Sequence, residues 1–254
     1  MNRFFVQPQD IKGKQVRFPQ DLSHQIIHVL RLKDGDLVAV LDNSGSVYRT
    51  ALDIDPAAKT VQGRIMDSST AKGEPVVQIE LCVGLSHRDK VEWVLQKGTE
   101  VGVSVFRPFI SSRTLVQSRE LKPKRRDRWE NIIREAAEQS GRGKLPRLEA
   151  PVPLKDLMDE EKPGETLFLL AWEEADPETS DLSGVLGKFS GRQIRLFVGP
   201  EGGFSEEEVQ DARNGGCQVI SLGDRILRME TAAILFPGLV LHLIENPIPV
   251  EKKN

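Results

Sequence analysis

Two glycine-rich stretches toward the C-terminal end hold the residues best suited to chemistry. The first is Gly199-Pro200-Glu201-Gly202-Gly203, and the second runs from Leu222 to Ala232 and contains Arg225, Arg228 and Glu230. Glycines let the backbone adopt conformations closed to other residues and let a ligand approach closely. Both stretches follow apolar runs, so we expect them at the ends of neighbouring strands, where a small ligand meets backbone donors and acceptors. Ordinary strand-to-helix turns have the same composition, and the spacing is not that of a dinucleotide site.

Alternating strands and helices are predicted to position these turns. Strands are expected at 76–85, 103–110, 166–171, 194–198 and 219–222, and helices at 90–101 and 123–139. Ser205 and Glu208 form a capping box that begins a further helix, and Gly102 is expected to end the first one. This alternation predicts an α/β fold with a mainly parallel sheet covered on both faces.

A last helix is predicted from an apolar face near the C-terminal end. Its members are Ala232, Leu235, Phe236, Leu239, Val240 and Leu243. Pro237 lies inside this pattern and is expected to kink or split the helix. The residues from 246 to 254 are expected to form a loose tail.

The first 70 or so residues predict a separate, β-rich domain. Short alternating runs indicate strands at 15–18, 37–41, 47–52 and 60–65, with a hairpin turn at 42–45. One helix is predicted over 19–32, with Leu22, Ile26, Val29 and Leu30 on one face. A domain of this size can close into a small barrel. The polar stretch 67–75 marks the boundary, which gives domains at 1–71 and 75–246.

Composition is typical of a soluble, cytoplasmic globular protein. The 254 residues are 39% hydrophobic and 29% charged. No apolar run approaches membrane-spanning length, and the N-terminus does not resemble a signal peptide. Cys82 and Cys217 lie in apolar surroundings, as expected of buried, reduced thiols. The scattered histidines and cysteines have no metal-site spacing, so we expect no metal.

The charge is distributed unevenly, although the net charge is only -3. Between Arg113 and Arg147 there are eleven Lys and Arg residues against five Asp and Glu, an excess of six. This segment is compatible with docking on a phosphate backbone or with a solvated, salt-bridged helix face. Five of its cations crowd the start of the helix predicted from residue 123, where positive charge opposes the helix dipole. That arrangement favours phosphate binding.

Several motifs occur in an order that resembles one known family. They are Gly199-Pro200-Glu201-Gly202-Gly203, Leu222-Gly223-x-Arg225-Ile226-Leu227-Arg228-x-Glu230-Thr231-Ala232, His28-Val29-Leu30-Arg31-Leu32-Lys33-x-Gly35-Asp36, Lys97-Gly98-x-Glu100-x-Gly102-Val103 and Glu138-Gln139-Ser140-Gly141-Arg142. The chain resembles the RsmE family of the SPOUT class, whose members methylate N3 of a uridine in small-subunit (16S) ribosomal RNA with S-adenosylmethionine. The resemblance implies a PUA-like barrel that helps hold RNA, then a parallel sheet with a C-terminal trefoil knot. It also implies a homodimer, with the active site completed by the partner chain.

The resemblance assigns the cofactor to the loops after three strands. The implied cofactor residues are Leu170, Ala171, Gly199, Pro200, Glu201, Gly202, Gly203, Leu222, Gly223, Ile226, Leu227, Arg228 and Thr231. Candidate RNA contacts are Arg3, Arg31, Lys33, Lys122, Lys124, Arg125, Arg126 and Arg142. Arg142 follows a glycine, so a role as partner of the helix C-terminal dipole is an alternative.

Uridine N3 carries a proton that must leave, which requires a general base or a cation that stabilises the uridine anion. Glu201 and Glu230 are candidate bases, and Arg228 or Arg142 is the candidate cation. Both glutamates could instead organise the loops by accepting backbone hydrogen bonds.

Three alternative functions remain open at the level of sequence. The first is a related knotted methyltransferase that acts on transfer RNA, and the second is a ribosome-assembly factor that binds RNA without catalysis. The third is an α/β enzyme for a small substrate. Saturable binding of S-adenosylmethionine separates the methyltransferases from the assembly factor.

Overall fold

The chain forms two units, which are described separately. In the computed structural model, residues 1–114, 120–160, 165–176 and 180–247 are described. Unit 1 comprises Met1–Glu74 together with Arg134–Leu145, and unit 2 comprises the described residues of Pro75–Ile133 and Pro146–Asn254. The segment 134–145 was expected in the second domain. It belongs to unit 1 because Ala137 packs with Phe5 and Leu41, and Glu138 accepts a hydrogen bond from the Phe5 amide at 3.1 Å.

Unit 1 is built on a six-stranded sheet. Its strands are β1 (Arg3–Phe5), β2 (Ile11–Lys12), β3 (Gln15–Arg17), β4 (Leu37–Leu41), β5 (Ser46–Asp55) and β6 (Thr60–Thr70), in the order β1-β4-β5-β6-β3-β2. The β1 strand runs parallel to β4, and the other neighbours are antiparallel. The four predicted strands are confirmed. The sequence Arg-Phe-Phe of β1 does not alternate between polar and apolar residues, and β2 has only two residues, so neither strand was predicted. Asn43 and Gly45 have positive φ in the predicted hairpin turn between β4 and β5.

The helix of unit 1 changes type part-way along. The α1 helix (Gln20–His24) continues into η2 (Gln25–Val29), a π-helical turn. Leu22 and Ile26 are buried as predicted, but Val29 is 65% exposed and Leu30 is 38% exposed. The wider π turn shifts the helical phase, so the predicted apolar face does not extend past Ile26. Arg31 follows with a left-handed φ of 53°.

Unit 2 contains a seven-stranded, entirely parallel sheet, which confirms the α/β prediction. Its strands are β7 (Gln78–Gly84), β8 (Val105–Ile110), β9 (Arg147–Leu148), β10 (Val152–Pro153), β11 (Thr166–Ala171), β12 (Gln193–Val198) and β13 (Gln218–Ile220). The main order is β10-β8-β7-β12-β11-β13, and β9 pairs with β8. The helices are α2 (Arg88–Val101), α3 (Pro123–Ser140, shared with unit 1), α4 (Leu154–Met158), α5 (Leu182–Gly187), α6 (Glu206–Asn214) and α7 (Met229–Glu245). None of the described helices is long and apolar enough to cross a membrane.

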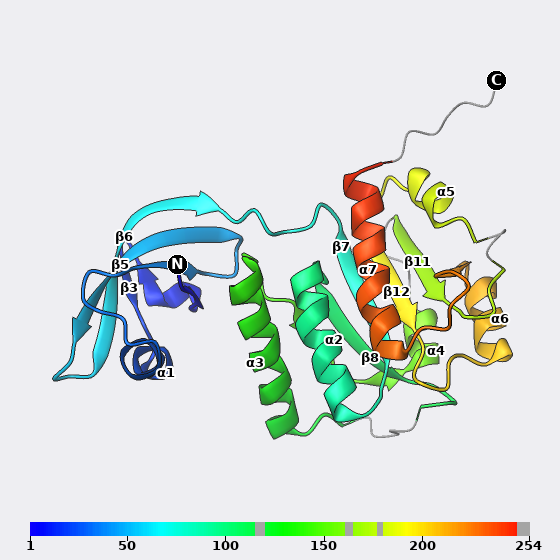
Figure 1. The fold of residues 1–254 in the computed structure, drawn as a ribbon, viewed down its shortest axis with the longest axis horizontal. Helices are drawn as coiled ribbons and strands as arrows, with labels where there is room; N and C mark the ends of the chain where they lie inside the picture. The colour runs from blue at the N-terminus through cyan, green and yellow to red at the C-terminus, as the bar shows by residue number, and fades with distance from the viewer. Residues whose placement is uncertain (115–119, 161–164, 177–179, 248–254) are drawn as a thin grey trace. The chain divides into compact units, whose positions relative to one another are not determined.

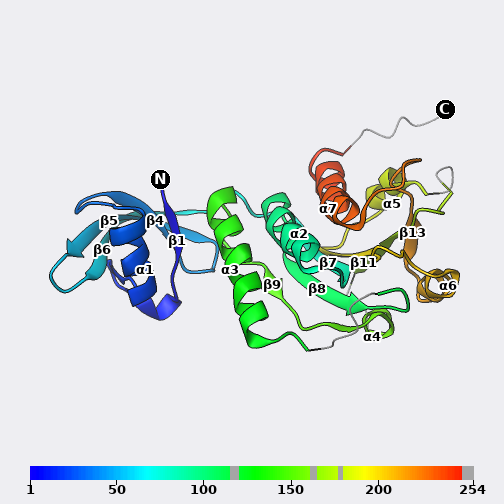
Figure 2. The ribbon, with the colours of Figure 1, turned by 60° about the horizontal axis from the view of Figure 1, so that its bottom comes forward.

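Successive side chains of each strand point to opposite faces of this sheet, and a hydrophobic core lies on each face. On β7, Ile79, Leu81 and Val83 join one core with residues of α2 and α7, whereas Cys82 joins the other with residues of α4 and α6. Figures 1 and 2 show α2 and α7 side by side on the first face. Burial raises the pKa of the Cys82 thiol, which keeps it protonated and unreactive. Both cysteines are free and buried, as predicted.

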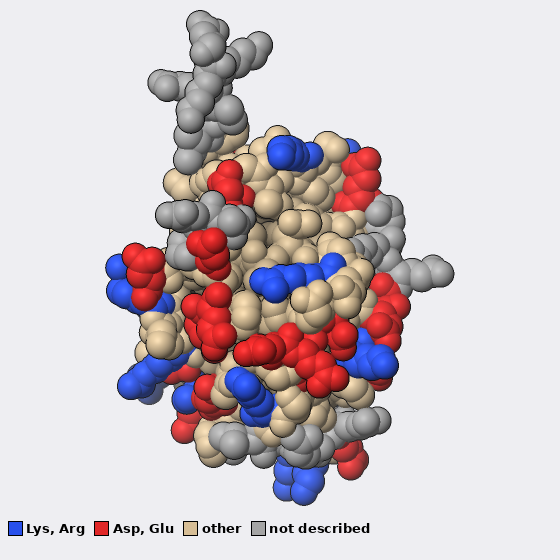
Figure 3. Space-filling model, turned by 90° about the vertical axis from the view of Figure 1, so that its right-hand side faces the viewer, with Lys and Arg blue, Asp and Glu red and all other residues tan. Residues whose placement is uncertain are grey.

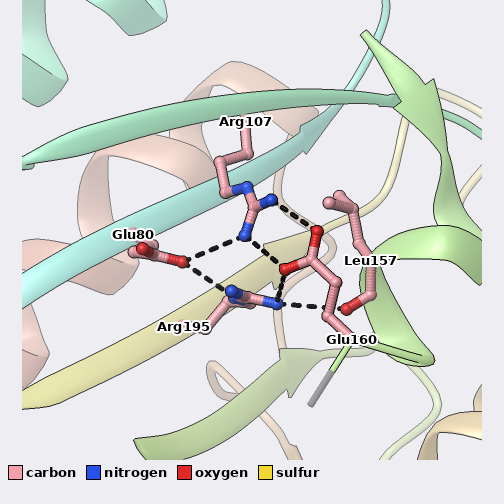
Figure 4. A network of polar contacts seen from close by, with 5 residues as sticks. All are labelled: Glu80, Arg107, Leu157, Glu160 and Arg195. Carbon is pink, nitrogen blue, oxygen red and sulfur yellow. Dashed lines mark hydrogen bonds and ion pairs between the residues drawn. The ribbon is translucent and has the colours of Figure 1, made fainter. Parts of the chain in front are cut away.

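A network of charges lies on the α4 and α6 face of the sheet. Arg195 on β12 donates to Glu80 on β7 at 2.8 Å and forms an ion pair with Glu160 at 2.9 Å. Arg107 on β8 donates to both carboxylate oxygens of Glu160, at 2.6 and 2.7 Å, and Figure 4 shows the four side chains around one point. The Arg195 side chain is 3% exposed and that of Glu80 is 7% exposed. Each buried charge therefore depends on its partner.

The last helix, α7, is unbroken across Pro237, so the expected split is wrong. Proline removes one backbone hydrogen bond, but Phe236, Pro237 and Val240 are buried and hold the helix against the core. Leu235, expected on the buried face, is 39% exposed. The capping box of Ser205 and Glu208 at α6 and the positive φ of Gly102 after α2 are as predicted.

Figure 3 views the face of unit 2 that carries α6, and acidic side chains gather across its middle. The first turn of α6 contains Glu206, Glu207 and Glu208. Negative charge at a helix N-terminus complements the dipole, so these residues suit the helix itself.

Candidate functional site

A cavity of about 380 Å³ opens at the edge of the parallel sheet where β11, β12 and β13 end. Because β11 lies between the other two, the loops that follow these strands are neighbours. The cavity is lined by Ala171, the last residue of β11, with Trp172 and Glu173 after it, and by Val198, the last residue of β12, with the residues up to Glu201 after it. The carboxyl edge of a parallel sheet is where α/β proteins bind small ligands, and this volume falls in the usual range of about 300–1,000 Å³.

Most of the predicted cofactor residues line this cavity. They are Ala171, Gly199, Pro200, Glu201, Gly203, Leu222, Gly223, Ile226, Leu227 and Arg228. Three others lie outside the lining. Leu170 is fully buried in the core behind the cavity, Thr231 is exposed on α7, and the Gly202 carbonyl accepts a hydrogen bond from Arg113 at 3.1 Å.

Glycine is required at several points around the cavity. Gly203 and Gly223 have φ of +68° and +101°, in the left-handed region that disfavours other residues. Gly84, at the end of β7, supports the loop from behind, because a Cβ atom there would lie 2.4 Å from the Pro200 nitrogen. The glycine-rich turn thus rests directly on the neighbouring strand.

One wall of the cavity carries a polar cluster. Lys90, in the first turn of α2, lines the cavity, and its Nζ lies 3.1 Å from Glu201 Oε1 and 3.8 Å from Glu230 Oε2. Ser86 is buried after β7 and donates a hydrogen bond to Glu201 Oε1. Burial opposes the charge on Glu201, but the Ser86 hydrogen bond and Lys90 hold its pKa below the ordinary carboxyl value. Glu201 is therefore ionised at neutral pH.

Ser86 and Lys90 were not among the residues predicted from sequence. A usable signal was present, because Ser86 follows a predicted strand and Lys90 begins the next predicted helix. The carboxyl ends of parallel strands share one edge, so this connection was predictable at the same edge as the glycine loops, although its distance from them depends on the strand order.

A model of the RNA methyltransferase domain family matches residues 72–241 of this chain. The chain is also 34% identical to ribosomal RNA small subunit methyltransferase E of Synechocystis over 246 residues, which cover 96% of this chain and 78% of that protein. The chain belongs to this family. The Bacillus subtilis methyltransferase E is 31% identical, with 92% of this chain and 93% of that protein covered. These relationships confirm the predicted resemblance to the RsmE family.

Solved structures of methyltransferases have the same fold as this family member. A methyltransferase E from Neisseria gonorrhoeae, bound to S-adenosyl methionine, superposes with a TM-score of 0.83 at 29% identity, covering 96% of this chain and 98% of that one. A methyltransferase from Legionella pneumophila, in complex with the same cofactor, has a TM-score of 0.78 at 27% identity, covering 94% and 96% of the two chains.

Arg142 does not have the environment expected of an RNA contact in this methyltransferase family member. Its side chain is 3% exposed in unit 1, and its Nε donates to Glu74 Oε1 at 3.0 Å. Glu74 also accepts from the Gly143 and Lys144 amides at 2.8 and 3.0 Å. This environment favours a structural role for Arg142 over the catalytic and RNA-binding roles expected for it, because a buried, paired guanidinium is withheld from a dissolved substrate.

Removing the carboxylate of Glu74 is expected to lower the stability of unit 1, by more at neutral pH than in acid. Burial opposes its charge, but Arg142 and the two amides hold the Glu74 pKa below its ordinary value. Because the Glu74 pKa is lower in the folded state, the carboxylate contributes its full stabilisation at pH values above the pKa of a glutamate in the unfolded chain, about 4.3. That contribution is lost as the pH falls through the folded value. We expect Glu74→Gln to cost about 1–3 kcal/mol at pH 7 and less in acid.

Amide hydrogen exchange in β4 and β5, measured at several pH values, reports this change within unit 1. Strands β7 and β12 of unit 2 are the internal control. Equal protection of β4 in the wild type and in Glu74→Gln at neutral pH would contradict the assignment.

Among the other predicted RNA contacts, some side chains have a partner within the chain and others are exposed, and Arg126, whose side chain is 47% exposed, is both. Arg3 donates to the Gly141 carbonyl at 3.1 Å, Arg125 lies over the Trp129 ring at 4.6 Å, and Arg126 pairs with Glu130 at 2.7 Å. Four further predicted RNA contacts are exposed, namely Arg31, Lys33, Lys122 and Lys124. The described residues contain no group of three or more His, Cys, Asp or Glu side chains arranged to hold a metal ion.

Proposed function

We propose that this protein transfers a methyl group from S-adenosylmethionine to N3 of a uridine in small-subunit (16S) ribosomal RNA. The single observation that carries the proposal is the cavity lined by both glycine loops, in a chain that belongs to the RNA methyltransferase family. The relatives named ribosomal RNA small subunit methyltransferase E support the substrate, and the Neisseria structure supports the cofactor.

The cavity residues suit this cofactor. Leu222, Ile226 and Leu227 offer an apolar surface for an adenine ring, and the backbone of Gly199 and Gly203 can approach a ligand closely. Ile226 is 87% exposed, as expected of an apolar side chain that a ligand would cover. Bound S-adenosylmethionine would supply an electrophilic methyl group on a sulfonium, which requires no metal. The protein's contribution is to place the base in line with that group.

The base also has to lose its N3 proton, and the site contains groups suited to this task. Glu201 and Glu230 supply carboxylates, and Arg228 on the cavity wall supplies a cation for the developing uridine anion. The uridine is expected to leave its stack to reach them.

Unit 1 is proposed to be a PUA-like barrel that holds the RNA. Its exposed cations Arg31 and Lys33 follow the distorted helix η2, and a π-helical turn is often found at a functional site.

We also propose the SPOUT trefoil knot for unit 2, with support from a strand order in which β11 separates β12 from β13. The protein is proposed to act in the cytoplasm.

A homodimer is proposed from the apolar surface of unit 2. Trp93 on α2 is 57% exposed and Leu235 on α7 is 39% exposed, and these two helices pack together. A second copy that covers this face would bury both side chains and bring its own residues toward the cavity. Sedimentation equilibrium of the wild type and of Trp93→Glu tests the dimer. A wild-type monomer at micromolar concentration would overturn it.

The exposed lysines before and within α3 are predicted to contact RNA phosphates. Replacing Lys122 and Lys124 together with Gln should weaken RNA binding and make it less dependent on salt. Each lost phosphate contact should lower the slope of log K against log salt by about 0.7 for single-stranded RNA. Filter binding across a salt series measures this slope, with substitution of another exposed lysine, Lys188→Gln, as control. An unchanged slope would exclude these lysines from the interface.

The function is tested by methyl transfer to defined RNA. Protein, labelled S-adenosylmethionine and small ribosomal subunits that lack the modification are incubated, and the labelled nucleoside is identified after digestion. Labelled 3-methyluridine is the expected product. A different labelled nucleoside would overturn the site specificity, and label in transfer RNA alone would overturn the substrate. Absence of cofactor binding would favour an assembly factor.

A further inference from the structure

Lys90 is the point at which three separate segments of unit 2 meet beside the cavity. Lys90 lies in the first turn of α2, Glu201 lies in the loop after β12, and Glu230 lies in the first turn of α7. The ammonium group approaches both carboxylates, at 3.1 and 3.8 Å. The three side chains are between 19% and 34% exposed, so their charges interact more strongly than those of a surface pair.

The two carboxylates differ in how fully they are engaged. Oε1 of Glu201 accepts a hydrogen bond from Ser86 and is paired with Lys90. Oε2 of Glu230 is buried and lacks a hydrogen-bond partner among the described residues, although it lies within ion-pair distance of Lys90. A buried acceptor without a partner is costly, and accepting a proton removes part of that cost.

We propose that Lys90 is a positioning residue that keeps Glu201 as a permanent ion-pair partner and leaves Glu230 to accept the proton of the target base. The inference rests on the proposed methyl transfer to uridine N3. It assigns different roles to two glutamates that the sequence could not tell apart. Ser86 supports the arrangement by fixing Glu201 from the buried side.

The proposed step balances in protons and electrons. Glu230 takes the N3 proton, and the electron pair left on N3 forms the bond to the methyl carbon. The bond from that carbon to sulfur breaks with its electrons going to sulfur, whose positive charge is thereby neutralised. The Lys90 ammonium group offsets the negative charge of the two carboxylates before the proton arrives.

The first test compares Lys90→Met with Lys90→Arg. Lys90→Met should lower kcat about 100-fold, by a larger factor than it weakens the calorimetric affinity for S-adenosylmethionine, because the carboxylates lose their positions while the backbone of the glycine loops is retained. Lys90→Arg, which keeps the charge, should restore part of the rate. Lys97→Met is the matched control, since Lys97 lies on the same helix and pairs only with Glu100 among the interactions described for it.

The second test follows the carboxyl groups and the pH dependence. In carbon-detected NMR of the protein without cofactor, Lys90→Met should raise the pKa of Glu201, because an attractive charge is lost. Glu230→Gln should lower kcat by a factor of about 100 or more at neutral pH. Its rate should then rise about tenfold per pH unit, because solvent hydroxide replaces the missing base. A purely structural loss would not recover in this way.

The outcomes separate this inference from the function on which it rests. Wild-type protein that binds cofactor but methylates no RNA would overturn the proposed function itself. Active wild type with an unaffected Lys90→Met variant would overturn only the role of Lys90. A Glu201→Gln variant that shows the alkaline recovery, with Glu230→Gln lacking it, would reverse the assignment of the two glutamates.

Discussion

Gly84→Ala is expected to weaken binding of S-adenosylmethionine by a factor of about 10–100, or about 1.4–2.7 kcal/mol. The added Cβ would lie 2.4 Å from the Pro200 nitrogen and 2.6 Å from its Cδ atom. Real Cβ atoms do not approach a backbone atom so closely, so the loop from Gly199 to Gly203 must move. Because this loop lines the cavity, the displacement should reach the ligand directly.

Isothermal titration with the cofactor measures the effect, and thermal unfolding reports how much of it is general destabilisation. Overpacking of this kind costs about 1–3 kcal/mol in stability by itself. Gly187→Ala is the control, because a Cβ at Gly187 meets no atom within 4 Å. A Gly84→Ala protein that is less stable but binds the cofactor normally would show that the loop does not depend on this contact.

Arg195→Met should destabilise unit 2 by about 3–5 kcal/mol. The substitution leaves Glu80, only 7% exposed, without its hydrogen bond at 2.8 Å. Its remaining cation, Arg107, lies 3.4 Å away and is already bound by Glu160 through both carboxylate oxygens. A buried carboxylate that loses its main partner accounts for most of the expected cost.

Hydrogen exchange of β7 and β12 under native conditions measures this loss. Adding Glu80→Leu to Arg195→Met should recover part of the stability, since the uncompensated charge is then removed and the pair of Arg107 with Glu160 persists. Lys97→Met, which breaks a partly exposed pair, should cost less than about 1 kcal/mol. Equal losses in Arg195→Met and Lys97→Met would mean that the network contributes no more than a surface pair.

The strands, helices and loop edges of unit 2 were largely predictable from the sequence. The apolar runs locate β7, β8, β11 and β12 to within two residues, and the capping box locates the start of α6. These signals are local, because strand and helix periodicity and the hydrogen bonds of a cap involve residues that are close in sequence. The glycine turns also indicated a cavity, since parallel strands place their carboxyl ends at one edge.

Other features depend on residues that are distant in sequence. The expected RNA contact Arg142 is instead buried against Glu74, and the segment 134–145 belongs to unit 1. The helical periodicity near residue 25 could not reveal the π turn, which changes the phase of the helix. Pro237 predicts a break when only its own helix is considered, but packing on the core outweighs one lost hydrogen bond.

The sequence by itself determined the α/β pattern, the two glycine loops and, through its motifs, the family. The tertiary structure decided which charged groups act together. Lys90, Glu201 and Glu230 meet only because β7 and β12 are neighbours in the sheet and α2 packs against α7. Glu80 and Arg195 are likewise paired by strand register. Local spacing contains no information about such contacts, because they are set by the balance of burial and charge over the whole unit.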